Sequence, residues 1–166
     1  TFPARFMLAA AMNPCPCGWH GADVRECACP PGARERYRRR LSGPLLDRVD
    51  LHVPVAAVDP EALRSKKRGE DSATVRARVV AARAVQAERN HRHGARVNAE
   101  LPVRALEHLC TPARRARRAL DDALEDMALS ARAHDRILKV ARTLADLAGR
   151  DTIDVPDIAE AVAYRQ

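Results

Sequence analysis

Residues 129–148 read LSARAHDRILKVARTLADLA, and this stretch decides the fold more than any other part of the chain. Ser130 can cap a helix, because its hydroxyl accepts a hydrogen bond from a free backbone amide of the first turn. Gly149 follows at the kind of position where helices commonly end. The apolar residues between them recur at helical spacing on one face: Ile137, Leu138, Ala141, Leu144, Ala145 and Ala148. The stretch therefore predicts an amphipathic helix with one buried face.

Similar start signals predict further helices around this one. Ser72 can cap a long helix that reaches about residue 93, and Pro102 opens one that runs to about residue 110. Residues 111–112 combine a threonine cap with a proline at the first helical position. Asp154 and Asp157 have the spacing of a capping box before a last helix to about residue 164. From residue 72 onward we expect a bundle of four or five helices.

The composition favours mainly α structure. Hydrophobic residues make up 46% of the 166 residues, but aromatic residues only 3%. The core must therefore be built largely from alanine, valine and leucine, and alanine and leucine have high helix propensity. No apolar run approaches the ~20 residues that span a bilayer, and no secretory signal is visible. Five cysteines without such a signal indicate reduced thiols or a metal site, and a cytoplasmic protein.

The charge leaves two interpretations open. The formal net charge is +7, and nearly all of the basic residues are arginines. A polyanion partner, either nucleic acid or nucleotide phosphate, would account for this excess. A general preference for arginine on solvated helix faces would account for it equally well.

The first part of the chain predicts a different kind of structure. Residues 6–12 are continuously apolar and stop at Asn13, which is typical of a buried strand. Such a strand needs partners, and the start at Thr1 suggests that the chain continues upstream. A short basic helix is expected over residues 34–40, and residues 49–55 alternate like a second strand. Residues 57–71, polar and with a basic cluster at 66–68, are expected to be a linker.

Four cysteines lie in an irregular loop over residues 14–33 that is rich in proline and glycine. Two C-x-C pairs, Cys15 with Cys17 and Cys27 with Cys29, are separated by nine residues. Four thiolates can close a tetrahedral site on Zn²⁺, although C-x-C is less common than C-x₂-C in such sites. His20 is a possible substitute ligand. The alternative is a set of free surface thiols.

Three motifs carry a resemblance to a known family. Residues 13–18 read NPCPCG, and residues 41–53 read LSGPLLDRVDLHV. The third motif, residues 129–147, is the helical stretch quoted above without its last residue. In this order the motifs resemble the C-terminal part of the magnesium-chelatase-like, competence-associated AAA+ ATPases. The resemblance covers nearly the whole chain.

The resemblance implies a domain organisation and partners. Residues 1–56 would be the C-terminal part of an incomplete α/β nucleotide-binding core, and residues 72–166 a helical lid domain. Family members use ATP with Mg²⁺, are similar to hexameric ring ATPases, and in natural transformation act on DNA. The upstream phosphate loop is missing here, because no G-x-x-x-x-G-K-[ST] motif occurs in the chain.

The same resemblance implies roles for four residues. Asn13 matches sensor 1, which orients the attacking water; its alternative is an ordinary Asn-Pro turn. Arg48 matches the arginine finger inserted into a neighbouring subunit's ATP site; its alternative is an ion pair with a flanking aspartate. Arg132 matches sensor 2 in the lid. Helical spacing places Arg136 and Lys139 on the same basic ridge, opposite the apolar face, with Arg136 as a second phosphate contact; the alternative is a solvated face.

Two functions of different classes follow from these patterns. The first is a segment of an ATPase that couples nucleotide hydrolysis to DNA processing. The second is a zinc-stabilised nucleic-acid-binding module without catalysis, supported by the cysteines and the charge. The second function explains neither the 41–53 motif nor the unpaired apolar run, so the first is preferred.

Overall fold

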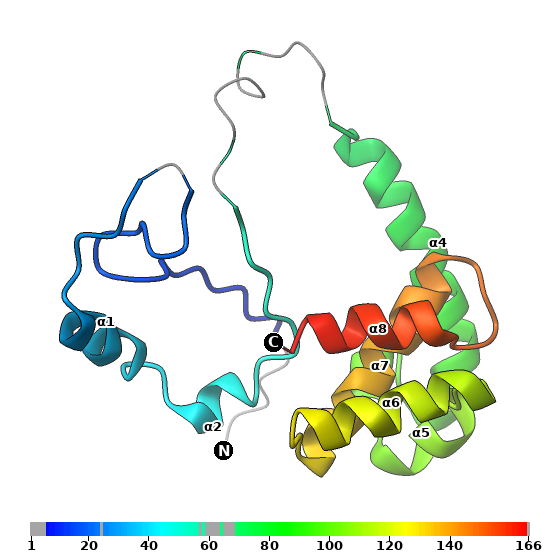
Figure 1. Cartoon of the computed structure of the whole chain (residues 1–166). Helices are drawn as coiled ribbons and strands as arrows, with labels where there is room; N and C mark the ends of the chain where they lie inside the picture. The colour runs from blue at the N-terminus through cyan, green and yellow to red at the C-terminus, as the bar shows by residue number, and fades with distance from the viewer. Residues whose placement is uncertain (1–5, 24, 57, 59–63, 65–68, 166) are drawn as a thin grey trace. The chain divides into compact units, whose positions relative to one another are not determined.

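The computed structural model describes residues 6–23, 25–56, 58, 64 and 69–165 (Figure 1). The chain divides into two compact units, one of residues 1–46 and 54–63 and the other of residues 47–53 and 64–166. Regular structure in the described residues is helical, apart from an isolated bridge between Pro112 and Ile153. The prediction of mainly α structure is therefore confirmed.

The described part of the first unit contains two short helices. They are α1 (Pro31–Arg38) and α2 (Gly43–Leu46). Helix α1 begins three residues before the basic helix that the sequence predicts, since Pro31 at its first position is compatible with a helix start. Most of the predicted linker over residues 57–71 lies outside the described residues.

Neither predicted strand forms among the residues that the structure describes. Residues 6–12 and 49–55 are irregular, and Phe6, Met7 and Leu8 are exposed. A strand exists only when a neighbouring strand pairs with its backbone groups, and no described segment offers that pairing to either run. The prediction of a buried strand before Asn13 is therefore wrong for this structure.

The second unit is a helical bundle. Its helices are α4 (Ser72–Asn90), α5 (Val103–Leu109), α6 (Arg114–Asp126), α7 (Ala131–Leu147) and α8 (Val155–Ala163). Two 3₁₀ turns, η1 (His91–His93) and η2 (Asn98–Glu100), connect α4 to α5. Helix α7 packs against α4, α5 and α8, and α6 packs against α8 (Figure 1). No described helix is both long and apolar enough to cross a membrane.

The capping signals predicted for α7 and α8 are present in the structure. Ser130 caps α7, with its Oγ accepting a hydrogen bond from the Ala133 amide at 3.3 Å. Gly149 follows α7 with φ of +68°, a left-handed conformation that costs glycine little. Asp154 and Asp157 form a complete capping box at the start of α8. Local hydrogen bonding thus sets these helix ends.

Two other start signals differ from the prediction. Asp71, not Ser72, caps α4, because its carboxylate accepts from the Thr74 amide at 2.7 Å. Thr111 does not cap α6: its hydroxyl donates to the Glu107 carbonyl at the end of α5, at 2.5 Å, and Pro112 forms the bridge with Ile153. Helix α6 then begins at Arg114 without a side-chain cap.

Replacing Ser130 with alanine should lower the free energy of unfolding by about 1 kcal/mol, because the first turn of α7 loses its cap. Ser130→Gly is the matched control and should cost only a few tenths of a kcal/mol, since glycine is itself tolerated at this position. Urea denaturation followed by circular dichroism measures both. Equal losses for the two variants would contradict the capping role.

The apolar core of the second unit gathers around α7. Ile137 and Ala141 on this helix are fully buried, together with Leu120 of α6 and Ile158 of α8. Cys110 is also fully buried, and burial raises the pKa of its thiol to about 11. The apolar face predicted from the sequence is the face that packs, except that Ala148 at its end is exposed.

A polar network is buried beside this core. Asp146 accepts two hydrogen bonds from Arg89, at 2.6 and 2.8 Å, and one from Arg142 at 3.1 Å. Asn98 donates to Asp146 at 2.8 Å and accepts from Asn90 at 3.0 Å. Burial alone would raise the pKa of Asp146, but the hydrogen bonds from Arg89 and Asn98 and the two positive charges lower it below the ordinary value. The network ties α4 and η2 to α7.

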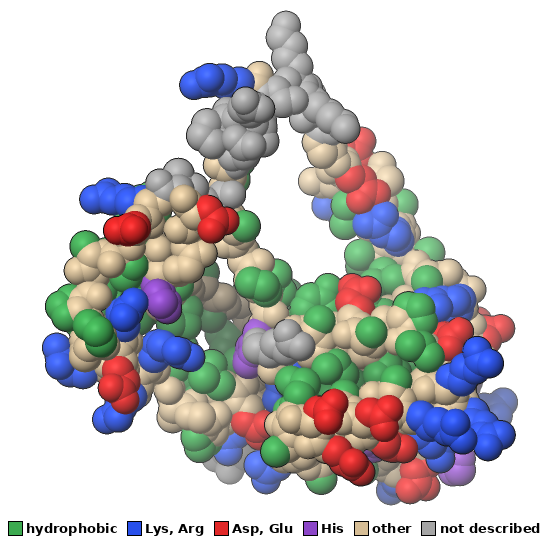
Figure 2. Space-filling view, viewed as in Figure 1, with side chains coloured by type: hydrophobic (Ala, Val, Ile, Leu, Met, Phe, Trp, Pro, Cys, Tyr) green, Lys and Arg blue, Asp and Glu red, His purple; other side chains and the backbone are tan. Residues whose placement is uncertain are grey.

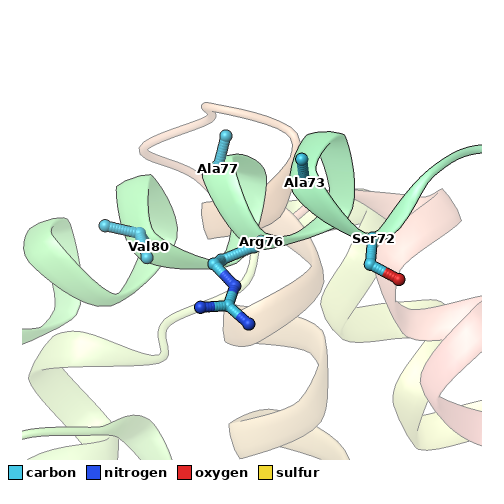
Figure 3. Close-up of a pocket in the computed structure, with 5 residues that line it drawn as sticks. All are labelled: Ser72, Ala73, Arg76, Ala77 and Val80. Carbon is cyan, nitrogen blue, oxygen red and sulfur yellow. The ribbon is translucent and has the colours of Figure 1, made fainter.

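The first half of α4 is exposed on all sides, since residues 71–81 are all exposed. A shallow hollow there is lined by Ser72, Ala73, Arg76, Ala77 and Val80 (Figure 3). All five residues belong to one helix, so this hollow is a stretch of helix surface rather than a site enclosed by several elements.

Candidate functional site

Arg48 lies in a segment of the second unit, residues 47–53, that two arginines hold in place. Arg136 of α7 donates to the Asp47 carbonyl at 2.9 Å and pairs with the Asp50 carboxylate at 3.1 Å. Arg165, just after α8, pairs with the Asp47 carboxylate at 3.2 Å and donates to the Val49 carbonyl at 2.5 Å. Two arginines thus fix the backbone on both sides of Arg48.

The Arg48 side chain itself is exposed. No hydrogen bond or ion pair joins its guanidinium to any residue that the structure describes. The two aspartates that could have paired with it bind Arg136 and Arg165 instead. Arg48 therefore presents five N–H donors and a permanent positive charge to solvent from a fixed backbone.

The basic ridge predicted on α7 divides into residues with different environments. Arg132 lies in the first turn and is exposed, with no side-chain partner among the described residues. Arg136 is only one quarter exposed and is engaged with Asp47 and Asp50. Lys139 donates to the Ala99 carbonyl at 3.1 Å. Of the three, Arg132 is the one available to an anion without breaking an internal bond.

Asn13 lies in the first unit, on an exposed irregular segment just before the cysteine loop. Its side-chain amide packs beside Gly18, whose φ is +84° and whose absent Cβ would lie 3.9 Å from the amide. The Gly18 amide donates to the Cys15 carbonyl at 3.0 Å and closes the turn between them. The position of Asn13 thus depends on the conformation of this turn.

The four cysteines of residues 14–33 converge, as their spacing permits. Their Sγ atoms all lie within 4.8 Å of one another, and such a cluster could hold a metal such as zinc. A backbone hydrogen bond from Trp19 lowers the pKa of Cys17 to about 6. Burial and the neighbouring thiols raise the pKa of Cys29 to about 12. Four neighbouring thiols resist ionising together without a cation to offset their charge.

Sequence reasoning missed the buried partners that hold the segment around Arg48. Arg165 was not singled out, yet its side chain is only 6% exposed and reaches a segment 118 residues earlier in the chain. The backbone of His52 adds a hydrogen bond to the Tyr164 carbonyl at 2.8 Å. Contacts between such distant segments leave no local periodicity, so no signal in the sequence could have identified them.

Comparison with known proteins identifies the family. The model described as "Magnesium chelatase, subunit ChlI C-terminal" matches residues 69–165, and "Magnesium chelatase, subunit ChlI" matches residues 1–63. The chain belongs to the magnesium chelatase subunit ChlI family, and the resemblance seen in the sequence is confirmed.

Curated relatives align along nearly the whole chain. YifB of Salmonella typhimurium is 43% identical over 166 residues, and the competence protein ComM of Haemophilus influenzae 42% over 165 residues. A protein of Mycobacterium tuberculosis is 44% identical over 165 residues. Each alignment covers 99% of this chain but only 31–32% of the relative. The chain thus spans about a third of the length of these relatives.

Proposed function

We propose that this chain is the C-terminal segment of an AAA+ ATPase that couples ATP binding and hydrolysis to DNA processing. The observation that supports it most is Arg48, exposed and unpaired among the described residues on a backbone that Arg136 and Arg165 hold in place. An arginine finger needs both properties, because it must reach a phosphate on another subunit without first leaving an internal partner. The family membership supports the same function.

In this proposal the other candidate residues contact nucleotide within one subunit. Asn13 acts as sensor 1 and orients the attacking water, since its amide can both donate and accept. Arg132 acts as sensor 2 at the γ-phosphate, because its guanidinium is exposed at the start of α7. Arg136 serves chiefly to hold residues 47–50, and would contact phosphate only by exchanging those bonds.

ATP and Mg²⁺ would be held mainly by residues outside this chain. The chain has no G-x-x-x-x-G-K-[ST] loop, so its own groups supply sensing and charge stabilisation rather than the phosphate cradle. The active form would be a ring of identical subunits, hexameric by family resemblance, in which Arg48 of one subunit completes the site of the next.

A basic patch at the start of α6 supports DNA as the partner. Arg114, Arg115, Arg117 and Arg118 are exposed, and their side chains pair with no residue that the structure describes. Figure 2 shows basic side chains gathered at one end of α6 and acidic ones along the rest. Four positive charges at the positive end of a helix dipole, with no side-chain cap, destabilise that end. A polyanion such as the DNA backbone would offset this cost.

The test is ATP hydrolysis by a protein that joins this chain to the remaining length of its longer relatives. We expect Mg²⁺-dependent phosphate release that rises when DNA is added. The chain by itself is the matched control and should release no phosphate, because it lacks the phosphate loop. A longer protein that neither binds nor hydrolyses ATP, with Mg²⁺ and DNA present, would overturn the proposal.

A further inference from the structure

The cysteine cluster of the first unit has the dimensions of a single-ion site. The Sγ of Cys15 lies 3.4 Å from that of Cys17 and 3.6 Å from that of Cys27, and Cys17 and Cys27 are 3.6 Å apart. Cys29 completes the group within the 4.8 Å limit. Four sulfurs at about 2.3 Å from a tetrahedral Zn²⁺ would be about 3.8 Å apart. The observed spacing therefore leaves room for one ion, with small adjustments.

The cysteines are not paired as disulfides. All four are free thiols, and their sulfurs are too far apart to be bonded, since a disulfide bond measures about 2.0 Å. Thiol groups are weak hydrogen-bond donors and acceptors, so hydrogen bonds among them provide little reason for four to converge. Soft thiolate ligands in tetrahedral array favour zinc over magnesium or calcium.

Among its described residues, the first unit has no apolar core that could organise this loop instead. Among the residues described in that unit, the one buried side chain is that of Cys15, which is 0% exposed. Helix α1 likewise buries none of its residues. A segment this small folds only when a metal, a disulfide or a larger partner fixes it. Among the described residues of this unit, the four thiols are the feature that can do so.

The four cysteines lie next to Asn13 and to the start of α1 in the sequence. Asn13 stands two residues before the first ligand and packs against Gly18, inside the loop that Cys17 begins. Cys29 is followed directly by Pro30, the residue that precedes α1. His20 and Arg34 add a contact at 3.3 Å between the loop and α1. A fixed cluster would therefore fix both the Asn13 turn and the start of α1.

We propose that Cys15, Cys17, Cys27 and Cys29 bind one structural Zn²⁺ that holds the Asn13 turn and the start of α1 in place. With four protein ligands the site is closed and offers no position for a reacting water, so the metal is structural rather than catalytic. Binding exchanges the thiol protons for the metal, and those protons pass to solvent. The metal site goes beyond the proposed ATPase function and does not rest on it.

The test uses the chain purified in reducing buffer, with metal content measured by atomic spectroscopy. We expect about one zinc per chain, released when a mercurial reagent titrates the thiols. Cobalt substitution should give the visible absorption of tetrahedral thiolate coordination. Trp19, the one tryptophan of the chain, lies within the loop, so its fluorescence should change when zinc is removed.

Cys17→Ser should lose the zinc, while Cys110→Ala should keep it, because Cys110 is buried in the core of the second unit. Circular dichroism guards against a general folding defect, since helices α4 to α8 have their own core and should persist in Cys17→Ser. Zinc-free protein with four freely reacting thiols would overturn the proposal, as would disulfides detected by mass. Equal zinc content in Cys17→Ser and the parent chain would also overturn it. Metal content is measured without nucleotide, so the result is separate from any ATPase measurement.

Discussion

Arg48→Ala, made in the longer protein used for the ATP hydrolysis test, is expected to lower the rate of ATP hydrolysis by about 10³-fold or more. In the proposed role the guanidinium would stabilise charge on the transferring phosphoryl group and would act chiefly in the transition state. ATP binding should change little, because in the proposed role Arg48 would reach the site of a neighbouring subunit and not the phosphate cradle of its own. Steady-state phosphate release and nucleotide titration measure the two effects separately.

Arg48 is suited to this test because its substitution should hardly affect folding. Its side chain is exposed and unpaired among the described residues, so its removal should leave the free energy of unfolding within about 0.5 kcal/mol. Arg48→Lys keeps the charge but loses the planar fork of donors, and should retain only part of the activity. Normal hydrolysis by Arg48→Ala would refute the finger assignment.

A separate experiment tests whether Arg48 acts on the ATP site of a neighbouring subunit. A subunit with Arg48→Ala binds ATP, whereas a subunit with a disrupted phosphate loop does not, and each alone should be inactive. In a mixture, the intact Arg48 of the second kind can reach ATP on the first, so part of the activity should return. Activity that stays absent at every mixing ratio would mean that Arg48 acts within its own subunit.

The helices of the second unit were predictable because their signals are local. Ser130, Gly149 and the Asp154–Asp157 box act on backbone groups within a turn or two, and the apolar face of α7 is a pattern of neighbours. Thr111 shows where such reasoning stops. Its neighbour Pro112 pairs with Ile153, 41 residues away, and this distant contact overrides the local cap.

One part of the candidate site could be predicted from local sequence signals, and another part could not. The convergence of the four cysteines follows from two close pairs joined by a short loop, and so could be predicted from spacing. The exposure of Arg48 could not, because it depends on Arg136 and Arg165 occupying Asp47 and Asp50. The apolar run over residues 6–12 gives no strand because pairing is a property of two segments, not one.

Replacing the buried Asp146 is expected to have the largest effect on stability. Its carboxylate side chain is 1% exposed and that of Arg142 is 3% exposed, while Arg89 also bonds to it. Asp146→Asn would leave two arginines without their counter-charge, because both point at the lost carboxylate. We expect the free energy of unfolding to fall by about 3–5 kcal/mol, the usual cost of breaking a buried pair from one side. Urea denaturation of the chain near neutral pH measures it.

The exposed pair of Glu70 and Arg78 provides the matched control. It has a similar geometry, with contacts at 2.7 and 3.0 Å, but its side chains are 43% and 49% exposed. Glu70→Gln should lower the free energy of unfolding far less than Asp146→Asn does, because water screens the charges of the exposed pair. If Asp146→Asn costs no more than Glu70→Gln, the buried network does not support the bundle.

The pH dependence gives this prediction a second, independent check. Folding lowers the pKa of Asp146, so its ionised form favours the folded state. That contribution is fully present above the unfolded pKa of about 4 and is lost as the pH falls through the lower, folded value. The stability gap between the parent chain and Asp146→Asn should therefore be widest near neutral pH and narrow in acid. A gap that stays constant from neutral pH to below pH ~3 would show that the lost charge is not what destabilises the variant.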